Sequence, residues 1–181
     1  MKRQIVLAGV GGQGLVSAGG MLAEAAAIYE KREALMMCAY GSEARGTFTK
    51  AEVIIDDEKR IYFPEVQQPD IVVALHQIAY ERYYAKMPEG SLLIYDSSCV
   101  TPKESPARQL GFPIATIAEE AGDVRSANIA ALGMISALGG TAGLEPLEEM
   151  VRKKFAGKAK VIDRNIQVLH AGYELMVNAS K

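Results

Sequence analysis

Apolar residues occur along this sequence in two alternating patterns, and the alternation predicts an α/β fold. Short runs of mostly consecutive apolar residues are typical of strands buried on both faces in a parallel sheet. Such runs predict strands at residues 4–8, 34–38, 71–75, 91–95 and 112–117. Segments with apolar residues three and four positions apart predict helices that pack one face against a sheet. They occur at residues 13–31, 76–86, 126–138, 146–157 and 164–179.

Residues 48–56 follow a different pattern, because polar and apolar side chains alternate there. One face of this strand is more apolar than the other, so we expect it near an edge of the sheet or exposed on one side. The polar turn at 56–59 and the run at 60–63 predict a hairpin partner. Together the elements predict one domain over residues 1–181. Its fold is a three-layer α/β/α, Rossmann-like arrangement with a mostly parallel sheet and an antiparallel hairpin.

Composition and charge exclude several functional classes. The 181 residues carry a net charge of −2, so the chain has no global basic field for nucleic acid. The sequence has no uncharged apolar window of about 18 residues, so we expect no membrane span. The N-terminus lacks the apolar region of a signal peptide, which predicts a cytoplasmic protein. Cys38 and Cys99 are too few for an iron–sulfur cluster and lack the pairing of a zinc site, so we expect two free thiols.

A glycine turn, Gly-Val-Gly-Gly-Gln-Gly at residues 9–14, connects the first predicted strand to the first predicted helix. The free N–H groups of a helix N-terminus attract anions, most often phosphate. Gly9, Gly11 and Gly14 also fit the dinucleotide spacing G-x-G-x-x-G. A Rossmann site needs an acidic residue at the end of the second strand, however, and residues 34–38 run into Ala-Tyr-Gly instead. Anion binding and close packing around the glycines both remain open.

A second loop, residues 40–47, places an aromatic, an acid and a base among glycines. Arg45 could hold a phosphate or carboxylate through paired hydrogen bonds, and Glu43 could orient Arg45. An internal Glu43–Arg45 pair or a contact to another subunit would use the same residues. Ligands collect at the carboxyl ends of strands in open α/β sheets. We therefore expect this loop, the glycine turn, His76 and residues 96–98 at one edge of the sheet.

Other polar residues do not complete a catalytic site. His76 follows a predicted strand and could act as an acid or base, but no partner can be assigned to it. Asn128 lies early in a predicted helix, where it could cap that helix or present its amide to a partner. His170, on the final helix, is expected to be a surface or packing residue. We therefore predict no catalytic residue and no metal ligand in this chain.

Two motifs together resemble the gamma subunit of 2-oxoacid:ferredoxin oxidoreductases, the family of pyruvate, 2-ketoisovalerate and 2-oxoglutarate synthases. They are Gly-Val-Gly-Gly-Gln-Gly at residues 9–14 and Tyr-Gly-Ser-Glu-Ala-Arg-Gly at residues 40–46. Residues 69–75 and 128–133 are also similar to the family's pattern. The resemblance covers roughly the whole chain, and the second motif is closer to the ordinary 2-oxoacid branch than to the related indolepyruvate enzymes.

The resemblance implies an enzyme complex that converts a 2-oxoacid, coenzyme A and oxidised ferredoxin to acyl-CoA, carbon dioxide and reduced ferredoxin. It implies that alpha, beta and small ferredoxin-like delta subunits hold the thiamine diphosphate, magnesium and iron–sulfur clusters. This chain would bind none of these cofactors, would be inactive alone, and would contribute coenzyme A access and assembly. The residues implied in cofactor binding are Gly9, Gly11, Gly12, Gln13, Gly14, Tyr40, Glu43, Arg45, Gly46 and Asn128.

Two other interpretations remain open for this sequence. A stand-alone Rossmann-type nucleotide-binding oxidoreductase would account for the glycine spacing, and an assembly module without a small ligand would account for both loops. The second loop also departs from the family, because Thr47 stands where the family commonly has a second glycine. If that position needs a positive φ, Thr47 is strained. We expect the choice of 2-oxoacid to depend mostly on the thiamine-bearing subunits.

Overall fold

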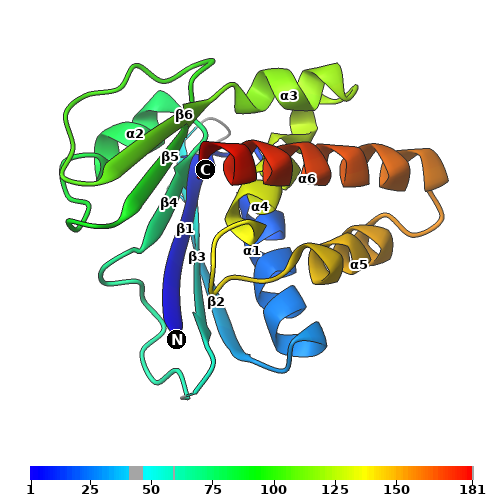
Figure 1. The fold of residues 1–181 in the computed structure, drawn as a ribbon, viewed down its shortest axis with the longest axis horizontal. Coiled ribbons are helices and arrows are strands. Elements are labelled where there is room, and N and C mark those ends of the chain that lie inside the picture. Colours follow the sequence, from blue (N-terminus) through cyan, green and yellow to red (C-terminus); the bar gives the residue numbers. More distant parts are fainter. Residues whose placement is uncertain (41–46, 59, 181) are drawn as a thin grey trace.

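The computed structural model describes residues 1–40, 47–58 and 60–180, and these residues include a six-stranded sheet (Figure 1). The strands are β1 (Lys2–Val10), β2 (Glu33–Tyr40), β3 (Phe48–Asp56), β4 (Ile71–Ala74), β5 (Leu92–Asp96) and β6 (Arg108–Phe112). Their order across the sheet is β2-β3-β1-β4-β5-β6. β1 therefore lies in the interior of the sheet, between β3 and β4.

Helices cover both faces of the sheet. They are α1 (Leu15–Glu24), α2 (Gln77–Tyr83), α3 (Ile114–Glu120), α4 (Ala127–Ser136), α5 (Leu144–Lys154) and α6 (Ala159–Ala179), with a π-helical turn at Ala25–Tyr29 and a 3-10 turn at Val124–Ser126. A large hydrophobic core packs α1 and α3 to α6 against one face, and a smaller core packs α2 against the other. Figure 1 shows α2 on the opposite side of the strands from α5 and α6. The predicted three-layer α/β/α fold is confirmed.

The consecutive apolar residues of β1 are explained by these two cores. Ile5 and Leu7 point into the larger core, whereas Val6 and Ala8 point into the smaller one. All four side chains are fully buried. Because successive side chains of a strand point to opposite faces, a strand covered on both sides must be apolar at every position.

The strand directions bring five carboxyl ends to one edge of the sheet. β1, β4, β5 and β6 pair in parallel, and β3 pairs antiparallel with both β1 and β2. The predicted antiparallel hairpin exists, but its predicted position at 48–63 is wrong. Its strands are β2 and β3, and residues 60–63 form no strand.

The expectation that residues 48–56 lie near an edge is confirmed, because β3 is the second strand of the sheet, between edge strand β2 and β1. The alternative expectation, exposure on one side, is wrong, because most residues of β3 are buried. Lys50 and Glu52, whose polarity suggested exposure, form an ion pair with Nζ and Oε1 2.5 Å apart. Pairing of the two charges lowers the cost of burying Glu52, whose side chain is only 8% exposed.

The predicted strand at 112–117 is wrong as well, because β6 ends at Phe112 and α3 begins at Ile114. Pro113 lacks a backbone N–H and stands as the residue before the helix. The buried carboxylate of Asp96, at the end of β5, accepts hydrogen bonds from the N–H groups of Ile114 and Ala115 at 3.1 and 3.0 Å. These bonds satisfy two helix N–H groups that would otherwise lack partners and fix where α3 begins.

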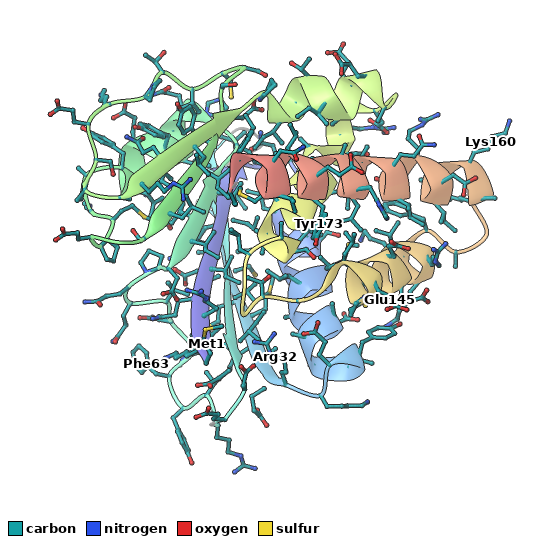
Figure 2. All side chains as sticks on the ribbon, viewed as in Figure 1. Met1, Arg32, Phe63, Glu145, Lys160 and Tyr173 are labelled. Carbon is teal, nitrogen blue, oxygen red and sulfur yellow. The ribbon has the colours of Figure 1, made fainter. Side chains whose placement is uncertain are left out.

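An ionic cluster ties together chain segments at the opposite end of the sheet. The Arg32 guanidinium donates to the carboxylates of Glu30 and Asp57 and to the carbonyls of Gly140 and Thr141. The amino group of Met1 also pairs with Asp57, at 3.1 Å. Figure 2 shows Met1 and Arg32 near one another at this end of the molecule. The cluster joins the starts of β1 and β2 to the connection between α4 and α5.

Two glycines allow α4 and α6 to cross with their backbones in contact. A Cβ atom added to Gly133 would collide with the carbonyl oxygen of Leu169, and one added to Gly172 would collide with the carbonyl oxygen of Ala130. Most of α4 is buried, and α6 packs across it. None of the described helices, including the 21-residue α6, combines the length and apolar character needed to cross a membrane.

We expect Gly172→Ala to destabilise the protein by roughly 3 kcal/mol, because the new methyl group meets rigid backbone. Gly20→Ala is the matched control, because Gly20 is also within a helix, α1, and a Cβ atom added there meets nothing within 4 Å. That change should raise stability by up to about 1 kcal/mol through reduced unfolded-state entropy. Urea unfolding of the two variants measures both effects. Equal stability of the two variants would contradict the close helix crossing.

Candidate functional site

The glycine turn follows β1 directly and leads into α1. Gly12 and Gly14 have φ angles of +99° and +71°, which side-chain-bearing residues rarely adopt. Gly14 is the N-cap of α1 and has no side chain to satisfy the first helical N–H groups. These groups therefore remain available to a ligand, since the first turn of a helix offers them no internal partner.

Gln13 holds the turn in shape from within. Its Oε1 accepts a hydrogen bond from the N–H of Val10 at 2.8 Å, and its Nε2 donates to the carbonyl of Leu75 at 3.0 Å. A Cβ at Gly9 would collide with the Gln13 side chain. The side chain thus joins the ends of β1 and β4 and supports the turn rather than pointing to solvent.

Asn128 fixes the other side of the turn. It is the second residue of α4, does not cap that helix, and donates from Nδ2 to the carbonyl of Gly14 at 3.0 Å. A Cβ at Gly14 would lie 2.6 Å from this amide nitrogen. Close packing therefore explains the glycines at 9 and 14. It does not explain Gly12, where a Cβ would meet nothing within 4 Å.

The turn opens into a cavity of about 440 Å³, which we call the turn cavity. Gly12, Gly14 and Asn128 line one side of it. The opposite side carries four basic side chains from the 3-10 turn, α5, the α5–α6 connection and α6, namely Arg125, Lys154, Lys158 and Arg164. The cavity thus combines the N-terminus of α1 with a surplus of positive charge.

Three of these cations have no acidic partner. Arg125 pairs with Asp123 at 2.8 Å, and its hydrogen bonds hold the pKa of that carboxyl below its usual range. Within the described ranges, no carboxylate lies at ion-pair distance from Lys154, Lys158 or Arg164. Arg164 donates only to the carbonyl of Gly122, at 3.3 Å. Asp123 also lines the cavity, and the charge of Arg164 contributes to the lowered pKa of its carboxyl, although the two groups are not at ion-pair distance. Four cations against one acid leave the cavity with a positive surplus for an entering anion.

Residues flanking the second predicted loop lie at the same edge. The N–H of Gly11 donates to the carbonyl of Thr47 at 2.9 Å, and Tyr40 pairs with Thr49 at the end of β2. The predicted site residues Glu43, Arg45 and Gly46, and the side chain of Tyr40, lie outside the described residues. The φ angle of Thr47 depends on the position of Gly46, so it also lies outside the described residues, and the strain considered for Thr47 stays an expectation.

The remaining polar groups at this edge have structural partners. His76 is the N-cap of α2, and its Nδ1 accepts from the N–H of Ile78 at 3.2 Å. Asp96 accepts from the N–H of Ser98 at 2.9 Å in addition to its bonds at the start of α3. His170 lies far along the chain on α6, with Nε2 2.6 Å from Glu148. His76 and Asp96 therefore shape the adjoining helices at this edge.

Cys38 and Cys99 do not fit an iron–sulfur cluster. Cys38 lies on edge strand β2 and Cys99 follows β5, which is four strand spacings away, roughly 19 Å at the usual separation. A cluster needs about four cysteine ligands within a few ångströms of one another. Within the described residues, no group of three or more His, Cys, Asp and Glu side chains is arranged to hold a metal ion.

The sheet order also disagrees with a Rossmann dinucleotide site. In that fold the strand carrying the ribose-binding acid follows the first helix and lies parallel beside the first strand. Here antiparallel β3 separates β2 from β1. The glycine spacing is thus present without the strand arrangement that would place a ribose.

Comparison with known proteins supplies the family. The family model described as pyruvate ferredoxin/flavodoxin oxidoreductase matches residues 4–175. The chain belongs to this family. A 2-oxoglutarate synthase subunit, KorC, from Methanocaldococcus jannaschii is 35% identical over 97% of this chain and 94% of its own length. The ketoisovalerate oxidoreductase subunit VorA of Methanothermobacter thermautotrophicus is 39% identical over 94% of this chain.

Solved oxidoreductase structures share the fold. The gamma subunit of a keto/oxoacid ferredoxin oxidoreductase from Geobacter sulfurreducens has a TM-score of 0.83 and 34% identity, covering 97% of this chain and 99% of that one. A 2-oxoglutarate:ferredoxin oxidoreductase from Magnetococcus marinus, with 2-oxoglutarate, coenzyme A and succinyl-CoA bound, has a TM-score of 0.86 and 26% identity. The match to that structure covers 98% of this chain but only 31% of the solved chain. The match to VorA likewise spans only about 36% of the length of VorA.

Sequence reasoning missed the basic wall of the turn cavity. Lys154 and Arg164 lie more than 130 residues beyond the glycine turn, in helices predicted only from their apolar faces, and Lys158 lies in the connection between those helices. The signal available was the excess of basic residues between the end of α5 and the start of α6. Without the fold, that excess is indistinguishable from a solvated surface.

We expect Gln13→Ala to destabilise the protein by about 1–3 kcal/mol, because the Val10 N–H loses its side-chain acceptor and the Leu75 carbonyl keeps only the weak thiol donor of Cys99. Gln68→Ala is the matched control, since Gln68 is exposed in the connection before β4. Urea or thermal unfolding of the two variants measures the difference. If Gln13→Ala were as stable as Gln68→Ala, the internal support of the turn would be wrong.

Proposed function

We propose that this chain is the gamma subunit of a 2-oxoacid:ferredoxin oxidoreductase and that the turn cavity binds the phosphates of coenzyme A. The observation that carries the proposal is the glycine turn facing three cations without acidic partners. Family membership and the similarity to KorC subunits over almost their whole length support the subunit assignment. The glycine turn and Asn128 would act as cofactor-binding residues through their position at the cavity.

The reaction of the proposed complex joins a 2-oxoacid and coenzyme A. Carbon dioxide leaves, the acyl group is transferred to the sulfur of coenzyme A, the thiol proton is released, and two electrons pass to two oxidised ferredoxins. Thiamine diphosphate supplies the carbanion chemistry when bound, and the proposed complex would also contain magnesium and iron–sulfur clusters as cofactors. We place all of these in partner subunits, because the two cysteines of this chain cannot share a cluster. This chain then admits and orients coenzyme A.

Electrostatics of the turn cavity suit a diphosphate. Backbone N–H groups at the start of α1 point outward at fixed positions, and a helix N-terminus carries a partial positive charge. Lys154 and Lys158 add mobile charges that reach a phosphate from the opposite side, and Arg164 adds a fork of donors. The thiol end of coenzyme A is then free to extend toward the subunit that holds the thiamine.

Partner contacts follow from the same assignment. We propose alpha and beta subunits and a ferredoxin-like delta subunit as partners in the cytoplasm, with ferredoxin reached through the complex. A stand-alone nucleotide-binding oxidoreductase is not favoured, because β3 lies between the two strands that such a site needs side by side. An assembly module without a ligand remains the competing proposal and predicts that the turn cavity has no effect on coenzyme A.

We expect Lys154→Gln with Lys158→Gln, in the assembled complex, to raise the KM for coenzyme A about tenfold or more. The KM for the 2-oxoacid should stay unchanged, because the lost charges face only the phosphates. Arg152→Gln with Lys153→Gln is the matched control on the same helix, since those side chains pair with Glu148, Glu149 and Glu24. Steady-state kinetics with each substrate varied in turn measures the effect.

An unchanged KM for coenzyme A in the Lys154/Lys158 variant would refute phosphate binding by the turn cavity and favour the assembly module. Size-exclusion chromatography of both variants checks that the subunits remain associated. Dephospho-coenzyme A, which lacks one phosphate, reports on whether the cavity holds the 3′-phosphate or the diphosphate. Full turnover by the isolated chain would overturn the subunit assignment itself.

A further inference from the structure

A second cavity, of about 390 Å³, lies on the opposite face of the sheet from the turn cavity. Its floor is formed by β1 and β3, one wall by α2 and the residues after it, and the other wall by the connection before β4. We call it the α2-face cavity. It belongs to the smaller hydrophobic core, whereas the glycine turn and its basic wall lie beside the larger one. The two cavities are therefore separate sites.

The α2-face cavity has more positive than negative charge. Lys50, Arg82 and Lys86 line it, against a single acid, Glu52. Lys50 is already paired with Glu52, which is buried on the floor. In the part of the chain that the structure describes, no carboxylate lies at ion-pair distance from Arg82 or Lys86. Two positive charges thus remain uncompensated at the rim.

Arg82 is held in position before any ligand arrives. Its guanidinium lies over the ring of Phe48 at 4.0 Å from the centroid. Stacking of this kind restricts the side chain and leaves the edge of the guanidinium, where the N–H donors are, free to bind. A planar carboxylate matches that edge through two parallel hydrogen bonds.

Tyr83 supplies a neutral donor in the same cavity. Burial, together with the nearby negative charge of Glu52, raises the pKa of its hydroxyl to about 12. The hydroxyl therefore keeps its proton at neutral pH and can donate it. Tyr83 lines the cavity, and among the described residues no acceptor lies within hydrogen-bond distance of its hydroxyl.

The remaining walls are apolar. Val66 and Pro69 line the cavity beside the charged groups. An inorganic anion would leave these apolar groups uncovered, whereas the stem of an organic acid would bury them. One carboxylate on an apolar stem fits both the donors and the walls.

We infer that the α2-face cavity binds an organic carboxylate attached to an apolar group. The carboxylate would accept hydrogen bonds from Arg82 and Tyr83 and pair with Lys86, while its stem packs on Val66 and Pro69. Two sources have this chemistry: a small organic acid, or an acidic side chain of a partner polypeptide.

The test is an NMR titration of the full chain with 3-methylbutanoate, and with 3-methylbutanamide as its uncharged counterpart. We expect saturable shifts of cavity resonances with 3-methylbutanoate, in roughly the millimolar range for so small a ligand, and none with the amide. Inorganic phosphate should bind this cavity more weakly than 3-methylbutanoate. Equal binding of the amide, tighter binding of phosphate, or no saturable shift would each overturn the inference.

Two variants locate the site and separate it from the proposed function. Arg82→Gln with Lys86→Gln should weaken 3-methylbutanoate binding about tenfold or more. Lys154→Gln with Lys158→Gln removes the same charge from the turn cavity and should leave that binding unchanged. The opposite pattern is expected for coenzyme A. If the two variants affected 3-methylbutanoate equally, binding would reflect general charge and the inference would fail, whatever the result for coenzyme A.

The source of the carboxylate follows from a third ligand, a blocked glutamate tripeptide with no other charge. Tyr83→Phe should weaken binding of either ligand several-fold, because one donor is lost. Tighter binding of the tripeptide than of 3-methylbutanoate would indicate an acidic side chain of a partner polypeptide. Tighter binding of 3-methylbutanoate would indicate a small organic acid. Both outcomes support the site.

Discussion

Antiparallel pairing of β1 with β3 is the interaction on which the rest of this structure depends. Nine residue pairs, from Lys2 opposite Asp56 to Val10 opposite Phe48, align the two strands over their full lengths. At one end this register brings Thr47 to the glycine turn. At the other it brings Asp57 to the amino group of Met1 and to Arg32. A shift of one residue would turn Ile5 and Leu7 away from the larger core.

The glycine turn owes its shape to contacts that lie inside the molecule, and this leaves its outward surface as bare backbone. The Gln13 side chain links the turn to the end of β4, and Asn128 links it to the start of α4. These hydrogen bonds fix the directions of the N–H groups at the start of α1. The opposite wall of the turn cavity is built from lysines with long, flexible stems. The wall formed by the turn thus has N–H groups in fixed directions. The wall formed by the lysines has positive charges whose positions can change to suit the proposed ligand.

Much of the fold could be predicted from sequence, because residues 5–8 of β1 and all of β4 are apolar and the helices carry clear apolar stripes. The failures have physical causes. The polar residues Lys50 and Glu52 neutralise each other at an interior strand, which a single-residue pattern cannot reveal. Pro113 and the distant carboxylate of Asp96 convert an apolar run into a helix start. The glycine turn could be located from sequence, whereas its basic wall required α5 and α6 to be placed in space.

The crossing of α4 and α6 has a consequence for the turn cavity. Asn128 at the start of α4 contacts the turn, and Arg164 near the start of α6 forms part of the facing wall. Since the backbones of the two helices touch at Gly133 and Gly172, neither can slide or tilt without breaking that contact. The width of the cavity is therefore set by main-chain geometry. If the turn cavity binds coenzyme A as proposed, differences in ligand bulk would be accommodated by the reach of Lys154 and Lys158, not by movement of the helices.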